Sequence, residues 1–247
     1  MSLGGDDYQC SGTLVEGSDD RFVIVTAAHC IFRKQLESFQ YNVMFLPGHG
    51  ENGNDDDCTS NPERCIYPSK GIISNEYVDA SKSGSWEVDY GFWVAPNDWN
   101  RDLRSRRPPF SPTNPGIHPF IKPMGISFDP MYVGKKTSLF GYPLDEDPYF
   151  MYSVGGLDDT PFPEEEGYFL ACSGLREGSS GGPWTQSISR NGDIVVASIN
   201  SWTWDDGSPG TGGPRLDTGG AACVYNAANQ ATLDNDRLTH EIAPCPR

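Results

Sequence analysis

At residues 25–30 the chain reads V-T-A-A-H-C, so that a histidine follows an apolar run and two alanines. Small residues let the backbone turn tightly, and such a turn would place the imidazole of His29 at the protein surface. A lone histidine is more often structural or exposed to solvent than functional. The role of His29 therefore has to be judged from the motifs that accompany it.

A glycine-rich turn, G-S-S-G-G-P, occupies residues 178–183. A nucleophilic serine needs such a turn, because its Oγ must stand clear of the chain and nearby amides must converge on the developing oxyanion. The backbone N–H groups of Gly178 and Ser180 are placed to form that oxyanion hole. Taken alone, a glycine-serine run is more often just a loop.

An acidic residue opens the hydrophobic stretch at residues 85–94, S-W-E-V-D-Y-G-F-W-V. An acid at the mouth of such a strand is partly buried and needs a partner. Accepting the Nδ1–H of an imidazole is one such role, and an ordinary carboxylate at a strand edge is the alternative. Glu87 would lie on the same face, but we prefer Asp89 because it abuts the D-Y-G-F pattern. We therefore predict a triad of His29, Asp89 and Ser180.

These motifs, together with C-S-G-T-L-V at residues 10–15, occur in the order His, Asp, Ser. Over most of residues 10–203 the chain resembles the trypsin/chymotrypsin family of serine peptidases. F-L-P-G at residues 45–48 and G-Y-P at 141–143 are closer in style to its glutamyl-endopeptidase-like branch. The resemblance implies an all-β fold of two antiparallel Greek-key β-barrels, with the active site in the cleft between them.

The resemblance also implies a mechanism. Ser180 attacks the scissile carbonyl, His29 acts as general base, and Asp89 fixes the histidine tautomer, so that hydrolysis passes through an acyl-enzyme. Ser201, Trp202 and Thr203 would pair with the backbone of a polypeptide substrate, and Ser201 Oγ is a further candidate for supporting Asp89. We expect a monomeric serine endopeptidase that needs neither a metal nor an organic cofactor.

Short runs rich in β-branched and aromatic residues recur between turn residues, as expected for an all-β chain. We predict strands at residues 21–26, 41–46, 89–94, 137–141, 168–172 and 193–202, and weaker helix signals at 30–39 and 226–242. The proline-rich stretch at residues 106–125 is expected to link an N-terminal barrel (8–105) to a C-terminal barrel with a short final helix (126–247). Carboxylates and amides alternate at residues 51–57, but without EF-hand spacing we predict a solvated loop rather than a calcium site.

The chain of 247 residues carries a formal net charge of −16, which excludes a nucleic-acid partner because phosphate binding needs a basic surface. It has no apolar run of about 18 residues, so we predict no membrane span. Seven cysteines without metal-ligand spacing predict disulfides, and hence a protein secreted or periplasmic whose leader has been removed. The resemblance implies the pairs Cys10–Cys30, Cys58–Cys65 and Cys172–Cys223, and leaves Cys245 as the odd thiol.

Two departures from the family pattern affect activation and specificity. Ser179 stands where trypsin-like zymogens carry an aspartate that pairs with a new N-terminal amine, so that route of activation is not expected. Glutamate-specific relatives place a histidine where this chain has Asn200, so glutamate specificity is not expected either. Arg176 remains a candidate for attracting an acidic substrate side chain, with exposure to solvent as the alternative.

Two other functions remain open. The first is an inactive homologue that binds a protein partner, with Arg176 and Glu177 obstructing the oxyanion hole. The second is an α/β-hydrolase esterase, because G-S-S-G-G fits G-x-S-x-G and His240 could follow Asp217 or Asp234. That fold needs a helix directly after the nucleophile, and Pro183 with its polar successors does not begin one convincingly.

Overall fold

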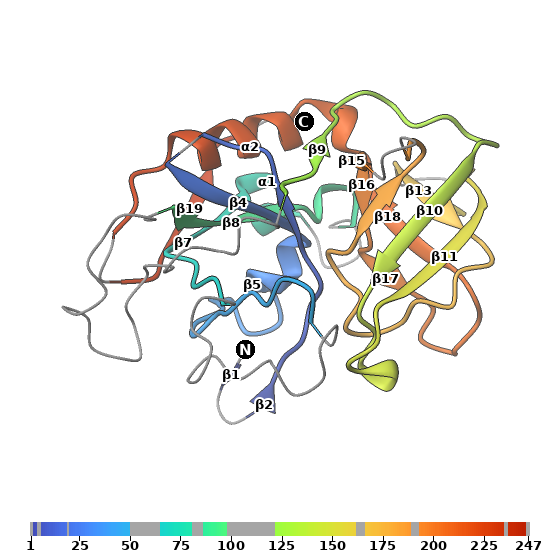
Figure 1. Ribbon diagram of the computed structural model, residues 1–247, viewed down its shortest axis with the longest axis horizontal. Coiled ribbons are helices and arrows are strands. Elements are labelled where there is room, and N and C mark those ends of the chain that lie inside the picture. The colour runs from blue at the N-terminus through green and yellow to red at the C-terminus, as the bar shows by residue number, and fades with distance from the viewer. Residues whose placement is uncertain are drawn as a thin grey trace.

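The strands of this chain gather in two groups that lie side by side (Figure 1). The computed structural model describes residues 2–3, 6–18, 20–49, 65–80, 86–97, 122–161, 166–188, 193–234 and 237–245. These residues form one five-stranded sheet, two four-stranded sheets and three two-stranded pairs, with few helices. The predicted all-β class is therefore confirmed.

The five-stranded sheet makes up most of the first group. Its strands are antiparallel except at one edge, where β19 runs parallel to β7. In spatial order they are β19 (Thr239–Ala243), β7 (Lys70–Ser74), β8 (Gly91–Pro96), β4 (Arg21–Thr26) and β3 (Thr13–Val15). Val23, Ile24 and Val25 are all at most 1% exposed, so both faces of β4 are covered, and its β-branched residues suit this pleated, buried position.

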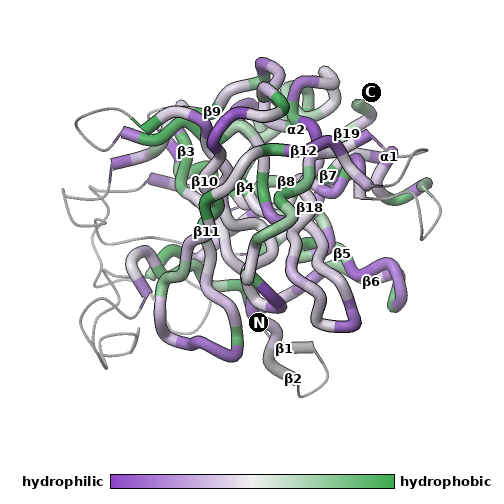
Figure 2. The backbone as a smooth tube through the Cα atoms, turned by 90° about the vertical axis from the view of Figure 1, so that its right-hand side faces the viewer, coloured by the Kyte–Doolittle hydropathy of each residue, from purple (hydrophilic) through white to green (hydrophobic). Residues whose placement is uncertain are grey.

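The two four-stranded sheets make up the second group. Both are antiparallel, and Leu139, Tyr168 and Trp184 pack together in their core. One sheet has the order β11 (Met151–Gly156), β10 (Lys136–Gly141), β14 (Pro183–Thr185) and β16 (Ser198–Ile199); the other has the order β12 (Asp158–Asp159), β13 (Gly167–Leu170), β18 (Thr211–Pro214) and β17 (Trp202–Thr203). Hydrophobic segments run through the interior near β8 and β18, whereas the outward loops are largely hydrophilic (Figure 2).

The C-terminal segment returns to the first group, which corrects the predicted domain boundary. Helix α2 (Gly220–Gln230) buries Ala221, Val224 and Ala228 in the same core as β4 and β8, and β19 then extends the first sheet beyond β7. Figure 1 accordingly shows the red C-terminal helix over the blue and teal strands of the N-terminal half. The last elements of the unit predicted as 126–247 therefore belong to the first group of strands, because the apolar face of α2 packs against that group.

The remaining elements are short. They are helix α1 (Asn75–Asp79), the 3-10 turns Ala28–Cys30, Trp86–Val88, Leu144–Glu146 and Leu216–Thr218, and the strand pairs β1 (Ser2–Leu3) with β2 (Asp6–Asp7), β5 (Phe32–Arg33) with β6 (Ser38–Phe39), and β9 (Gly125–Ile126) with β15 (Val195–Val196). The helix predicted at residues 30–39 is wrong, since these residues form the β5–β6 hairpin. The strand predicted at residues 41–46 reduces to one isolated bridge between Phe45 and Ile66.

Two disulfides join described cysteines. The predicted Cys10–Cys30 bond is present, but Cys223 pairs with Cys245, and Cys172 is an exposed free thiol. The predicted Cys172–Cys223 bond and the free Cys245 are therefore wrong. The cause is the return of α2 and β19 to the first group, which brings the two C-terminal cysteines together.

Several predictions fall on residues outside the described part of the chain. Cys65 is disulfide-bonded, but its predicted partner Cys58 is not among the described residues. The loop at 51–57 and the linker up to residue 121 also lie outside them. Among the residues that are described, no helix has the length and apolar character needed to cross a membrane.

His240 on β19 supports a prediction about acid stability. Its ring stacks on Phe39 at 4.3 Å between centroids, and its Nε2–H donates to the carbonyl of Gln40 at 2.9 Å. Burial lowers the pKa of His240 from 6.5 to about 4. The folded protein therefore binds fewer protons at this site than the unfolded chain, so stability is lost as the pH falls from about 6.5 toward 4. In His240→Gln this loss should be smaller, as measured by Tm against pH; an unchanged decline would contradict the assignment.

Candidate active site

The carboxylate of Asp89 is fully buried between the two groups of strands. Asp89 lies between the 3-10 turn Trp86–Val88 and β8, whereas His29 lies on the turn that follows β4. Because Thr26 at the end of β4 pairs with Gly91 at the start of β8, the two motifs are brought together. The D-Y-G-F pattern thus places its acid beside the histidine.

Within the described residues the carboxylate of Asp89 accepts three hydrogen bonds. The backbone N–H of His29 donates to Oδ1 at 2.8 Å, and the ring Nδ1–H donates to Oδ2 at 2.7 Å. Ser201 Oγ, from the second group of strands, donates to the same Oδ2 at 2.6 Å. A proton on Nδ1 leaves Nε2 of His29 as the acceptor that faces the pocket. Glu87, the alternative acid, instead accepts from the N–H of Glu166 at 2.7 Å.

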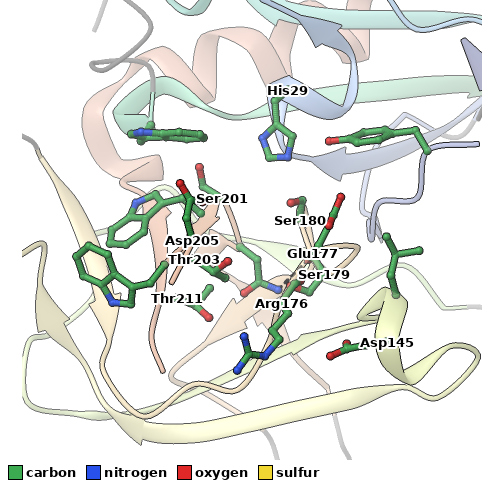
Figure 3. Close-up of a pocket in the computed structure, with 16 residues that line it drawn as sticks. His29, Asp145, Arg176, Glu177, Ser179, Ser180, Ser201, Thr203, Asp205 and Thr211 are labelled. Carbon is green, nitrogen blue, oxygen red and sulfur yellow. Dashed lines mark hydrogen bonds between the residues drawn. The ribbon is translucent and has the colours of Figure 1, made fainter. Parts of the chain in front are cut away.

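Ser180 and His29 line the same pocket from opposite sides. In Figure 3 the imidazole projects from the ribbon of the N-terminal half toward Ser180, which stands on the ribbon of the C-terminal half. The ring of Trp86 lies edge-on to His29, with centroids 6.4 Å apart. The structure thus brings together the three residues that the sequence predicts as a triad.

Glycines give the loop that carries Ser180 its shape. Gly178 and Gly181 have φ angles of 91° and 86°, which L side chains rarely adopt. A Cβ on Gly182 would overlap the carbonyl oxygen of Phe140 and lie 2.7 Å from Nδ2 of Asn200. The G-S-S-G-G run is therefore required by backbone geometry and close packing.

Two backbone amides of this loop have no hydrogen-bond acceptor among the described residues. Within the described part of the chain, neither the N–H of Gly178 nor that of Ser180 has an intramolecular acceptor. The carbonyl of Glu177, which shares a peptide plane with the Gly178 N–H, accepts from the N–H of Leu144 at 2.8 Å, and this bond fixes the orientation of that plane. Two free donors beside a serine hydroxyl are the arrangement that stabilises an oxyanion.

Asn200 has a structural role that the sequence does not reveal. Its Nδ2 donates to the carbonyls of Phe140 and Ser179 at 2.8 and 2.9 Å, and its Oδ1 accepts from Trp184 Nε1 at 2.7 Å. The residue is only 1% exposed. Its amide hydrogens are therefore committed to fixing the loop before Ser180, and Asn200 offers little to a substrate.

The pocket has a volume of about 850 Å³. Ser201, Trp202 and Thr203, the residues predicted to bind the substrate, line it, and Trp202 stacks on Phe169 with centroids 5.5 Å apart. Arg176 also lines the pocket, and its guanidinium donates to the carbonyl of Gly207 at 3.1 Å. Arg176 therefore links the segment before Ser180 to the loop that carries Gly207.

Tyr8 is a pocket residue that the sequence does not predict. Burial and the nearby negative charge of Asp89 raise the pKa of Tyr8 to about 12, so its phenol stays neutral. The guanidinium of Arg33 lies 4.7 Å from the centre of the ring. Nothing in the local sequence D-D-Y-Q-C indicates these contacts.

Residues of the esterase alternative do not reach Ser180. His240 lies on β19 of the five-stranded sheet and donates to the carbonyl of Gln40, and Asp217 pairs with Arg215 at 3.1 Å. Neither lines the Ser180 pocket. Among the described residues, His29 also lies close to the sulfurs of Cys10 and Cys30, but these sulfurs are bonded to each other and offer no thiolate ligand.

Comparison with known proteins finds similarity at the level of the fold. No family model and no curated protein matches this chain. A solved structure of the thermostable serine protease AL20 from an extremophilic microorganism is 20% identical, with a TM-score of 0.70 and 94% of each chain covered. The protease Anisep from Arthrobacter nicotinovorans is 22% identical, with a TM-score of 0.70 and 93% of each chain covered. A Glu endopeptidase is 17% identical, with a TM-score of 0.62 and coverage of 93% of this chain and 88% of its own.

These likenesses confirm the predicted fold class. The chain has the mostly-β fold of chymotrypsin/trypsin-like serine proteases, with Asp89 hydrogen-bonded to His29 and with His29 and Ser180 lining one pocket.

The glycine requirement of the loop can be tested with two alanine substitutions. Gly182→Ala should lower the free energy of unfolding by about 2–3 kcal/mol, because the new methyl group has no space. Gly174→Ala lies a few residues earlier, where an added Cβ meets nothing within 4 Å, and it should change stability by no more than about 0.5 kcal/mol. Urea unfolding measures both. Equal effects of the two substitutions would contradict the packing described.

Proposed function

We propose that this protein is a secreted serine endopeptidase that hydrolyses peptide bonds through an acyl-enzyme. The observation that carries the proposal is the Asp89–His29 pair, whose histidine lines one pocket with Ser180, together with the Gly178 and Ser180 amides, which have no acceptor among the described residues. Each group required for nucleophilic acyl transfer is thus present within one small region of the fold.

The chemistry follows from the hydrogen bonds. Nε2 of His29 accepts the proton of Ser180 as Oγ attacks the scissile carbonyl, and it later returns this proton to the leaving amine. The Asp89 carboxylate keeps the Nδ1 proton in place and stabilises the imidazolium that forms. The backbone N–H groups of Gly178 and Ser180 donate hydrogen bonds to the carbonyl oxygen as it becomes negatively charged. Water then repeats the sequence on the acyl-enzyme and releases the second product.

A polypeptide is the substrate class that best fits the wall of the pocket. Strand β17, at Trp202–Thr203, pairs with β18 and is the outer strand of its sheet within the described residues. Its free edge offers backbone donors and acceptors to an extended chain, which is β-augmentation. Such pairing binds the substrate backbone and leaves the choice of residue to the pocket.

Secretion rests on the cysteines. The Cys10–Cys30 and Cys223–Cys245 bonds fit an oxidising compartment, where disulfides persist. The high negative charge suits an extracellular medium and argues against nucleic-acid binding. We further propose that the protein acts as a monomer without a metal or organic cofactor.

Digestion of a proteome-derived peptide library tests the activity. The protein should cut peptides at internal bonds, and Ser180→Ala should lose this cleavage, because the variant lacks the proposed nucleophile. Liquid chromatography and mass spectrometry of the products will also reveal which residue the pocket prefers. Cleavage that persists in Ser180→Ala would contradict the proposal, and no cleavage by either protein would favour a binding homologue.

Asp89→Asn tests the role of the buried carboxylate. An amide cannot hold the histidine in the required tautomer, so kcat should fall by about 10⁴-fold. Glu87→Gln is the matched control, because Glu87 binds the N–H of Glu166 and not His29, and it should keep nearly full activity. Steady-state kinetics on the best library peptide measure both. Equal losses in the two variants would contradict the assignment of Asp89.

A further inference from the structure

We propose that Ser11 is a positioning residue for the oxyanion hole, an inference that rests on the proposed peptidase function. Ser11 does not line the pocket and touches no substrate. Its hydroxyl and backbone instead fix the peptide planes on which the Gly178 and Ser180 amides depend. Neither the glycine-rich motif nor the triad predicts this role.

Ser11 is hydrogen-bonded to the nucleophile loop at two points. Its backbone N–H donates to the carbonyl of Ser180 at 2.8 Å, and its Oγ–H donates to the carbonyl of Gly178 at 3.0 Å. The residue is 6% exposed, and its own carbonyl accepts from Thr26 Oγ1 at 2.9 Å. Ser11 is therefore itself held in place by the end of strand β4.

These two carbonyls matter because Gly178 has no conformational preference of its own. Glycine rotates freely about φ, and nothing local imposes the observed 91°. Each peptide unit is planar, so holding the Gly178 carbonyl fixes the plane that lies between the two oxyanion amides. Holding the Ser180 carbonyl fixes the plane that follows. Without these bonds the loop could turn its amides away from the pocket.

The same hydroxyl reaches the other wall of the oxyanion hole. Ser11 Oγ accepts the N–H of Tyr142 at 2.8 Å. Two residues later, the N–H of Leu144 holds the carbonyl of Glu177 at 2.8 Å and so orients the Gly178 amide. One buried hydroxyl thus connects both segments that direct the Gly178 and Ser180 amides.

The remaining contacts of the loop are also neutral. Ser179, between the two oxyanion residues, is 1% exposed and donates through Oγ to the carbonyl of Arg176 at 2.5 Å. Its carbonyl accepts from the N–H of Gly182 and from Asn200 Nδ2, both at 2.9 Å. Hydroxyl and amide groups therefore hold this loop, with Ser11 as its connection to the first group of strands.

A disulfide ties this connection to the general base. Cys10 precedes Ser11, Cys30 follows His29, and the two cysteines are bonded to each other. The position of Ser11 is therefore linked covalently to that of His29. The disulfide therefore limits movement of the oxyanion amides relative to the imidazole of His29.

Ser11→Ala tests the proposal. It leaves the Gly178 carbonyl and the Tyr142 N–H without their partner, so kcat should fall roughly 10–100-fold while KM changes little, a smaller loss than removing an oxyanion donor outright. The affinity of a peptide-aldehyde inhibitor, whose adduct places an oxygen in the same hole, should fall in parallel. Both are measured per folded molecule, with Tm recorded for each variant.

Ser74→Ala is the matched control. Ser74 is also buried, and its Oγ likewise donates to one carbonyl (Cys245, 3.2 Å) and accepts from one N–H (Glu76, 3.1 Å), but neither Ser74 nor these partners line the pocket. It should lower Tm without changing kcat.

Thr26→Val is a second test of the positioning role. It releases only the Ser11 carbonyl, so it should lower kcat less than Ser11→Ala does, and it replaces Ser11→Ala as the test if that variant does not fold.

The outcomes separate this inference from the function on which it rests. An active wild type, with reduced kcat and weaker aldehyde binding in Ser11→Ala but not in Ser74→Ala, supports the positioning role. An active wild type whose Ser11→Ala and Ser74→Ala forms have equal kcat per folded molecule overturns this role and leaves the peptidase proposal standing. A wild type without hydrolytic activity overturns both.

Discussion

The buried carboxylate of Asp89 is the interaction on which the rest of the site depends. A charge removed from water is costly unless hydrogen bonds satisfy it, and Asp89 at 0% exposure accepts from the backbone and ring of His29 and from Ser201. The first two donors belong to the group of strands that contains β4 and β8, and the third to the other group. One carboxylate thereby joins the two halves of the fold where the pocket lies.

Around this charge, the protein builds the rest of the site from neutral hydrogen bonds and close packing. Asn200 fixes the carbonyl of Ser179, Leu144 fixes that of Glu177, and Ser11 fixes those of Gly178 and Ser180. Gly178 and Gly181 allow the positive φ angles of the loop, and the hydrogen bonds of neighbouring groups restrict the backbone rotation that glycine otherwise permits. Among the described residues the amides of Gly178 and Ser180 have no acceptor, while neighbouring carbonyls of the loop are held by hydrogen bonds. This is the arrangement that the proposed oxyanion hole needs.

Local motifs predict which residues of this candidate site lie together, because the proposed chemistry needs particular residues in short patterns. The turn at V-T-A-A-H-C, the strand opened by Asp89 and the glycines around Ser180 each have a local physical reason, and the structure brings them together. The contacts of Tyr8 and Ser11 could not be found this way. Their partners lie far along the chain, and nothing beside them in sequence indicates which carbonyls or charges they meet.

Long-range returns of the chain also limit what the sequence can predict. The pairing of Cys223 with Cys245 depends on α2 packing against the first group of strands and on β19 joining β7, neither of which a cysteine pattern reveals. The apolar face of α2 fits either group on pattern alone. Residues 30–39 are a second example of a pattern that does not determine the structure. Their helical pattern is not realised, and they form a hairpin in which Phe32 packs edge-on against Phe39, with centroids 4.9 Å apart.

Labelling with a fluorophosphonate, followed by peptide mass spectrometry, tests the central claim most directly. The reagent reacts with a serine that a neighbouring base activates and that an oxyanion hole assists. The test therefore does not require the substrate to be known. Our account predicts one adduct on Ser180 of the native protein, with none on the adjacent Ser179, whose hydroxyl is turned inward to the Arg176 carbonyl. A folded protein that remains unlabelled at Ser180 would contradict the account.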